Sequence, residues 1–170
     1  MKILENIERF NRLMGYLGAA FVIPLMVAVV YEVFMRYALN APTEWVYDVS
    51  WMLFSAVFLL GGAYTMIENR HVRVDIIYSS LPRKVQIWHD LLFLAVIFLP
   101  VIGILTYRGY LYAALAWSSG ERLSTTMFIF PAGPVKTLIP LAFGMLFLQG
   151  IVELIKSLRK AFGKVNDHGA

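Results

Sequence analysis

The chain has 170 residues, of which 59% are hydrophobic and only 15% are charged. A water-soluble domain of this size needs many more charged residues for its surface, so this composition indicates an integral membrane protein. The net charge of +4 does not indicate nucleic-acid binding, because the basic residues lie at the ends of apolar stretches rather than along one face. Cysteine is absent, which excludes a disulfide, a thiolate nucleophile and a Cys-ligated metal.

Four stretches without Asp, Glu, Lys, Arg or His are long enough, with their flanks, to cross a membrane. A helix needs roughly 20 mostly apolar residues to span a hydrocarbon core of about 30 Å. The spans are predicted at about residues 13–36, 46–67, 88–116 and 137–156. We therefore predict an all-α membrane protein, with a single integral membrane domain over residues 1–170. Four transmembrane helices and short interfacial helices make up this domain.

Positive charges are distributed unevenly between the two sides of this four-span topology. Most of the 15 Lys and Arg residues lie in the amino-terminal tail, the link between spans two and three, and the carboxy-terminal tail. The other two links contain only Arg36, Arg108, Arg122 and Lys136. Because positively charged segments stay on the cytoplasmic side of a membrane, both termini are predicted to be cytoplasmic.

The first two spans are joined by a short polar turn at residues 40–43. Before span one, residues 5–12 are predicted to form an amphipathic turn at the cytoplasmic interface. Pro24 lies inside span one and predicts a kink there. After the turn, Thr43 is predicted to cap the second helix, with Glu44 in its first turn.

Span two contains a run of small residues, Gly61, Gly62 and Ala63. Small residues let helices approach closely, either within the chain or between this chain and a partner. In the polar link that follows, residues 71–76 alternate polar and apolar side chains. This alternation predicts an extended segment at the membrane interface, although a helical continuation of span two and a simple solvated loop stay open.

The later part of the chain contains two proline-marked boundaries. Pro82 marks the start of a helix that is predicted to run from Arg83 through Trp88 into span three. Residues 117–134 are rich in Gly, Ser, Thr and Pro and are predicted to be irregular or to lie in the membrane plane. This segment is too short, and too interrupted by proline, to be a fifth span.

Ionisable residues inside spans are functional candidates by default, because a charge in lipid is costly. Glu32 and Arg36 lie four residues apart on one helical face. The short turn could bring Arg36 to the level of Glu44 and Asp48. We predict an ion pair between Arg36 and Asp48, with Glu44 or Glu32 as competing partners. A structural pair is favoured over a proton or ion site, because no carboxylate lies at the middle of a span.

The sequence contains no motif of a catalytic, metal or cofactor site. All three histidines, His71, His89 and His168, lie outside the spans, whereas a haem-binding membrane anchor needs axial histidines within its helices. A glycine-rich phosphate loop, a serine nucleophile elbow and a paired-histidine metal motif are also absent. An enzyme is therefore not expected, and neither is a cofactor.

Two motifs resemble the small membrane subunit of tripartite ATP-independent periplasmic (TRAP) transporters. The first is Arg36-x3-Asn40-x-Pro42-x2-Trp45-x2-Asp48-x-Ser50, and the second is Leu60-Gly-Gly-Ala-Tyr64 leading into His71-Val-Arg73-Val-Asp75 and Leu81-Pro82. Ile139-Pro140 and Gln149 match the family's ending pattern. The family usually has Glu at the position of Asp48, which keeps the charge but has a shorter reach. The resemblance makes these residues candidates for structural or partner contacts: Arg36, Asn40, Trp45, Asp48, Gly61, Gly62, His71, Arg73 and Asp75.

The resemblance implies a three-part secondary transporter in a bacterial inner membrane. A periplasmic binding protein delivers an organic acid anion of the sialic acid or C4-dicarboxylate class. A large membrane subunit carries the anion across under a sodium gradient, and the small subunit pairs with the large one and braces it. Two alternatives are a self-assembling four-span transporter or channel and a membrane anchor for an enzyme. The first alternative needs an acidic residue at mid-depth in a helix, which this chain lacks. The second is weakened because the chain lacks haem ligands within its spans.

Overall fold

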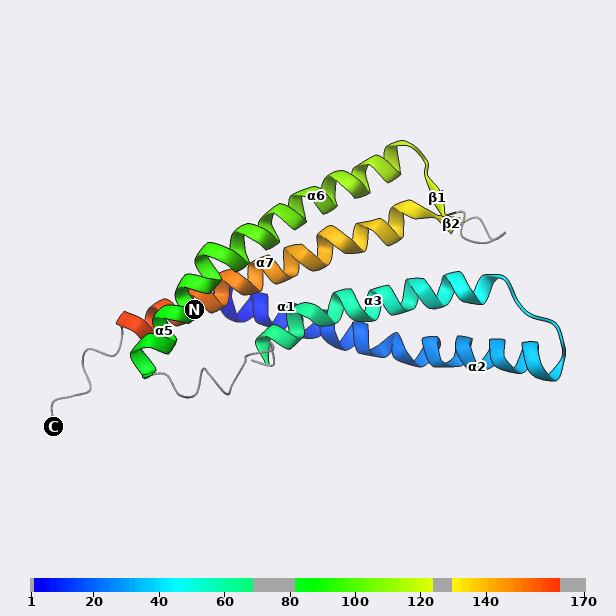
Figure 1. Cartoon of the computed structure of the whole chain (residues 1–170), viewed down its shortest axis with the longest axis horizontal. Coiled ribbons are helices and arrows are strands. Elements are labelled where there is room, and N and C mark those ends of the chain that lie inside the picture. Colours follow the sequence, from blue (N-terminus) through cyan, green and yellow to red (C-terminus); the bar gives the residue numbers. More distant parts are fainter. Residues whose placement is uncertain (1, 69–81, 124–129, 163–170) are drawn as a thin grey trace.

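The computed structural model describes residues 2–68, 82–123 and 130–162, and they are mainly helical, with two short strands and the turns between elements (Figure 1). In chain order the elements are α1 (Lys2–Ala20), α2 (Val22–Ala38), α3 (Trp45–Ile67), α5 (Arg83–Leu92), the π-helix η1 (Phe93–Phe98), α6 (Leu99–Ser118), β1 (Arg122–Leu123), β2 (Phe130–Pro131) and α7 (Ala132–Phe162). The all-α architecture predicted from composition is therefore confirmed, with one small two-stranded addition.

Four helical segments are long and apolar enough to cross a membrane. They are Lys2–Ala38, Trp45–Ile67, Trp88–Ser118 and Ala132–Arg159. The predicted amphipathic turn at residues 5–12 is not a separate element, because it is continuous with the first of these helices. The side of the membrane on which the termini lie, the interfacial helices and the single-domain organisation stay predictions.

The first long helix is interrupted at Phe21, where α1 passes into α2. Pro24 has no N–H group, so the carbonyl of Ala20 lacks the donor that normally lies four residues further on. The N–H of Phe21 is shared between the carbonyls of Leu17 (3.3 Å) and Gly18 (3.1 Å). The interruption predicted from Pro24 therefore lies one turn before the proline itself.

A second proline lies just after the π-helix. Pro100 cannot donate to the carbonyl of Val96, its usual acceptor in an α-helix. In the turn before it, the N–H of Leu99 donates instead to the carbonyl of Leu94, five residues back. The helix predicted to start at Arg83 and to enter span three is confirmed, but this widened turn within it was not predicted.

Helices α3 and α7 form the centre of the molecule. Helix α3 packs against α1, α2 and α7, whereas α6 packs along α7 (Figure 1). The buried core contains Leu60 and Ala63 of α3 and Met145 of α7, with Met14 of α1 and Leu146 of α7 packed against them. The core therefore lies where α1, α3 and α7 meet.

Glycines allow close approach at three helix contacts. A Cβ atom at Gly15 of α1 would lie 2.6 Å from the Cβ of Tyr64 in α3. A Cβ at Gly109 of α6 would lie 3.1 Å from a methyl carbon of Ile139 in α7. A Cβ at Gly150 of α7 would lie 2.8 Å from the ring of Phe98 in η1. Small residues at such crossings let membrane helices gain packing contacts that a larger side chain would prevent.

Two short strands join α6 to α7. Strands β1 and β2 pair antiparallel, with Arg122 opposite Pro131 and Leu123 opposite Phe130. The prediction of an irregular or in-plane segment over residues 117–134 is wrong at both ends of this range, since α6 reaches Ser118 and α7 already begins at Ala132, and the two strands lie between these helices. Residues 119–121 are irregular, as predicted. Pairing satisfies backbone polar groups that an irregular chain near a membrane would leave without partners.

Candidate functional site

The turn between α2 and α3 is closed by the carboxylate of Glu32. Arg36 donates to Oε1 of Glu32 through Nη2 (2.6 Å) and Nε (3.1 Å). The backbone N–H of Thr43 donates to Oε2 of the same carboxylate at 3.0 Å, and the Thr43 hydroxyl also donates to Oε2. Glu32 therefore ties the end of α2 to the residues that lead into α3.

Two predictions about this turn can be compared with the structure. Thr43 is not the N-cap of α3: Glu44 is the N-cap residue, and no side chain caps this helix, because Glu32 takes the Thr43 hydroxyl. Arg36 pairs with Glu32, which is one of the competing partners that the sequence allowed. Asp48 lies in the first turn of α3 and is buried, with 5% of its surface exposed.

Asn40 and Trp45 shape the same turn. Asn40 has a φ of 50°, the left-handed region that asparagine tolerates better than most residues. Next to it, the N–H of Ala41 donates to the carbonyl of Met35 at 3.0 Å, which ends α2. The indole ring of Trp45 lies 5.9 Å from the ring of Tyr31. These contacts give both residues a structural role in the hairpin.

The small residues of α3 face two directions. Ala63 is 1% exposed in the core, and a Cβ at Gly62 would lie 3.6 Å from the side chain of Leu146. A Cβ at Gly61 would meet nothing within 4 Å. Gly62 and Ala63 therefore contribute to packing inside the chain, whereas Gly61 lies on an open face. Three further candidates lie outside the described residues: His71, Arg73 and Asp75.

Gly61 continues an exposed aromatic face of α3. Four aromatic residues, between 55% and 73% exposed, precede it at alternating spacings of four and three residues: Tyr47, Trp51, Phe54 and Phe58. This spacing places all of them, with Gly61, on one side of the helix. Helix α3 is thus packed on its other sides and open on this one.

A buried polar contact joins α1 to α7. Asn11 and Gln149 are each 0% exposed, and Nδ2 of Asn11 donates to Oε1 of Gln149 at 3.0 Å. Nε2 of Gln149 in turn donates to Glu153 at 3.3 Å. This pair was not predicted from the sequence. An amide such as Gln149 in an otherwise apolar run is a usable signal, but Asn11 precedes the apolar stretch and gives none.

Ion pairs extend this contact at the same end of the bundle. Lys156 of α7 lies 3.2 Å from Glu153 and forms an ion pair with Glu8 of α1. Arg12 of α1 pairs with Glu68, at the end of α3, at 2.9 Å. Helix α1 is therefore bound to both central helices, and its start lies beside the end of α7.

Lys136 secures the opposite end of α7. It is 8% exposed, and its Nζ lies 2.6 Å from each carboxylate oxygen of Glu121. The same ammonium group lies 3.9 Å from the centre of the Tyr112 ring, within the range of a cation–π contact. Nearby, Nε1 of Trp117 donates to the hydroxyl of Thr137 at 2.9 Å. These contacts hold α6 against α7 beside the two strands.

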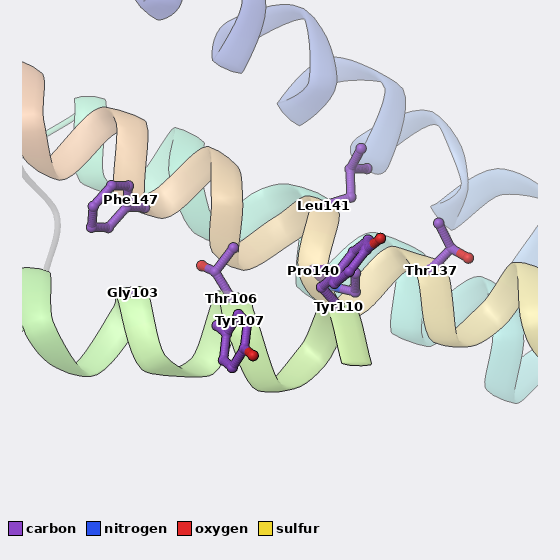
Figure 2. A pocket seen from close by; sticks show the side chains of 8 residues that line it. All are labelled: Gly103, Thr106, Tyr107, Tyr110, Thr137, Pro140, Leu141 and Phe147. Atoms are coloured by element: carbon purple, nitrogen blue, oxygen red, sulfur yellow. The ribbon is translucent and has the colours of Figure 1, made fainter. Parts of the chain in front are cut away.

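An open groove of about 600 Å³ lies between α6 and α7 (Figure 2). Its lining residues come from these two helices alone: Gly103, Thr106, Tyr107, Tyr110, Thr137, Pro140, Leu141 and Phe147. None of them is ionisable at neutral pH, so the groove offers no charge that could hold an organic anion. Among the residues that the structure describes, no group of three His, Asp or Glu side chains could hold a metal ion.

Comparison with known proteins identifies related sequences. The family model described as "Tripartite ATP-independent periplasmic transporters, DctQ component" matches residues 25–160. The chain is also 28% identical over 116 residues to the sialic acid TRAP transporter small permease protein SiaQ of Vibrio cholerae serotype O1. These residues make up 66% of this chain and 61% of the relative, so the match spans less than two thirds of the relative's length. The family match includes Gln149 and Lys156 of α7 but begins after Asn11.

Proposed function

We propose a function for this chain from one premise: it belongs to the family of DctQ components of TRAP transporters, whose model matches residues 25–160. It is thus a small membrane subunit of a transporter. We infer that it pairs with a large membrane subunit and braces it during sodium-driven uptake of an organic acid anion. The family match over most of the chain is the observation that carries this proposal.

The described part of the chain supports a bracing role better than transport by this chain alone. The groove between α6 and α7 lacks charged residues. The ionisable side chains of Glu8, Arg12 and Lys156 are engaged in pairs that hold helices together. Such fixed contacts suit a rigid scaffold, whereas a transport site needs a binding group that is available to substrate.

The open face of α3 supports a contact with the large subunit. Aromatic residues are enriched in the cores of protein interfaces, and the exposed aromatic face described above ends at Gly61, where a helix could approach closely. Gly62, its neighbour, faces Leu146 inside the chain. We therefore propose Gly61, rather than Gly62, as the small residue at the partner contact.

The substrate class follows from the relative and from the family. The V. cholerae relative is named for sialic acid, which is a carboxylic acid. We propose an organic acid anion of the sialic acid or C4-dicarboxylate class, delivered by a periplasmic binding protein. The specificity then lies in the other two components, because the groove between α6 and α7 has no charged residue in its lining.

We propose a bacterial inner membrane location with both termini in the cytoplasm. The ion pair between Glu8 and Lys156 supports the placement of both termini on the same side of the membrane. It requires the start of α1 and the end of α7 to lie at the same end of the bundle. The excess of Lys and Arg in the tails and in the link before α5 supports the cytoplasmic side.

Reconstitution into proteoliposomes tests the proposed function. This chain, the large subunit and the binding protein of the same transporter are supplied singly and together, with radiolabelled N-acetylneuraminate or succinate and an inward sodium gradient. We expect uptake only when all three are present and the gradient is imposed. Uptake by this chain alone would overturn the proposal and would favour the alternative of a self-assembling small transporter.

A further inference from the structure

Arg108 lies inside the third membrane-crossing helix and not in a link between spans. The charge count from the sequence assigned it to such a link, but α6 continues beyond it to Ser118. The side chain of Arg108 is exposed. Arg108 is therefore a charged residue on the surface of a helix that is long and apolar enough to cross a membrane.

The depth of Arg108 in the bundle follows from contacts on two sides of α7. A Cβ atom at Gly109, the next residue, would lie 3.1 Å from the side chain of Ile139 in α7. Seven residues further along α7, Leu146 lies 3.6 Å from the Cβ position of Gly62 in α3. Because α3 and α7 run in the same direction, Ile139 is level with the residue seven before Gly62, close to the midpoint of α3 (Figure 1). Arg108 is therefore near mid-depth.

Arg108 is on a different side of α6 from the contact with α7. The residues of α6 that are buried in this contact are Ile102, Gly109, Ala113 and Ala116. Arg108 instead shares a helical face with exposed apolar residues three, four and seven positions away, which are Val101, Ile104, Leu111 and Leu115. A single positive charge thus lies in the middle of an open apolar face.

The guanidinium group of Arg108 lacks a partner in the described part of the chain. Within residues 2–68, 82–123 and 130–162, no side chain forms a hydrogen bond or an ion pair with it. Four other cations of the long helices each pair with a glutamate of this chain, namely Arg12, Arg36, Lys136 and Lys156. Charges within membrane spans are costly and normally have such partners. Arg108 therefore needs an anion from another molecule.

The depth of Arg108 decides between the two common anions for a guanidinium group. Carboxylates and phosphates both match its paired donors. Lipid phosphates lie outside a hydrocarbon core of about 30 Å, so they are roughly 15 Å or more from its middle, further than an arginine side chain reaches. A carboxylate on a partner helix can lie at mid-depth, where acidic and basic side chains pair with one another. A protein carboxylate therefore fits this position better than a lipid.

We propose that Arg108 forms an ion pair with a carboxylate in a membrane helix of the large transport subunit. This inference rests on the proposed function, which supplies the large subunit as the partner. The exposed apolar residues around Arg108 pack against the same partner helix and shield the pair from lipid. Arg108 thus gives the large subunit a contact on α6 in addition to the one proposed at Gly61 of α3.

A methionine substitution tests the ion pair. Arg108→Met removes the charge but keeps a long, flexible side chain. Arg122→Met, at an exposed position of β1, is the matched control. Fluorescently labelled small subunit is titrated with the large subunit in lipid–detergent micelles. We expect Arg108→Met to weaken this association about tenfold or more, and Arg122→Met to leave it unchanged. The melting temperature of the isolated Arg108→Met subunit should not fall, because no described side chain loses a partner.

Three results would overturn the proposal while the proposed function stands. The first is equal association of the parent protein and Arg108→Met. The second is a lower melting temperature of the isolated variant, which would reveal a partner within this chain. The third is unchanged association with a loss of bound phospholipid, measured as phosphate per subunit, which would assign Arg108 to a lipid. A parent protein that does not bind the large subunit would contradict the proposed function itself, and this inference with it.

A charge exchange identifies the carboxylate. A photo-crosslinking residue in place of Ile104, one turn before Arg108 on the same face, marks the helix of the large subunit that lies there. Arg108→Glu should abolish the association, and a change of the facing Asp or Glu of that helix to Arg should restore it. If the marked helix contains no carboxylate, or if no such exchange restores the association, the proposed ion pair is wrong.

Discussion

Nδ2 of Asn11 in α1 donates a hydrogen bond of 3.0 Å to Oε1 of Gln149 in α7, and both side chains are completely buried. The two residues are 138 positions apart in the chain, so this bond joins the first helix to the last. Within a membrane-embedded bundle such a bond favours one relative position of two helices, because any slip leaves a buried amide without a partner.

Breaking the Asn11–Gln149 pair should destabilise the subunit. Asn11→Leu leaves the Gln149 amide without this donor, and we expect a loss of about 1–2 kcal/mol in the free energy of unfolding. Asn11→Leu combined with Gln149→Leu should cost less than the two single changes added together. Reversible unfolding in mixed micelles measures all four proteins. Strictly additive losses would show that the two amides do not interact.

Because α1 and α3 pack closely at Gly15, substitution of Gly15 should destabilise the protein more than substitution of Gly61. Gly15→Ala places a methyl group 2.6 Å from the Cβ of Tyr64, so a helix must shift, and we expect a loss of about 1–3 kcal/mol in unfolding free energy. Gly61→Ala is the matched control, since its methyl group meets nothing within 4 Å. A similar melting temperature for both variants would contradict the contact between α1 and α3.

The four membrane-spanning helices were predictable because length and apolarity are local properties of the sequence. The contact between α1 and α7 was not, because Asn11 lies in a polar tail and its partner is distant in the chain. Thr43 shows the same limit at short range. Its residue type and position predict a helix cap, but the carboxylate of Glu32, eleven residues earlier, takes its hydroxyl.

The prolines show a second limit on what the sequence can predict. Pro24 and Pro100 each remove one backbone donor, and sequence reasoning identifies where a carbonyl loses its partner. How the helix responds depends on what packs beside it. Near Pro24 the N–H of Phe21 is shared between two carbonyls, whereas before Pro100 the turn widens into a π-helix next to Gly150. Gly150 of the neighbouring helix leaves the room that the ring of Phe98 occupies beside this turn, and a contact so distant in the chain cannot be read from the local sequence.

The first hairpin should depend more on Glu32 than on Arg36. Glu32→Ala removes the acceptor of both Arg36 and Thr43, whereas Arg36→Ala removes only one of the two partners of Glu32. We therefore expect a larger fall in melting temperature for Glu32→Ala. Adding Arg36→Ala to Glu32→Ala should cost little more, because Arg36 has already lost this acceptor. An equal effect of the two single changes would contradict the central role of Glu32.

The topology can be measured with reporter fusions. Alkaline phosphatase is active only outside the cytoplasm, so a fusion after Gly169 should be inactive and a fusion at Gly120, between α6 and β1, should be active. The expectation rests on the excess of Lys and Arg in the tails and in the link before α5. A green fluorescent protein fusion at the same two positions is the complementary control, since it fluoresces only in the cytoplasm. The reverse pattern would refute the proposed orientation.

The contact with the large subunit can be separated from packing inside this chain. Gly61→Leu puts a large side chain on the open face of α3, so it should weaken co-purification of the large subunit while the melting temperature of the isolated small subunit is unchanged. Gly62→Leu is the matched variant on the next residue. Its side chain points toward Leu146, so it should lower the melting temperature of the isolated subunit itself.

The two glycine variants therefore distinguish a partner surface from an internal one. Phe58→Ala, one turn before Gly61 on the same exposed face, provides an independent test, because its ring is 73% exposed in this chain alone. If the exposed face of α3 is the contact, Phe58→Ala and Gly61→Leu should both reduce the yield of the complex and the sodium-driven uptake that depends on it. Full complex formation and full uptake by both variants would place the large subunit elsewhere, without affecting the assignment of this chain to the TRAP family.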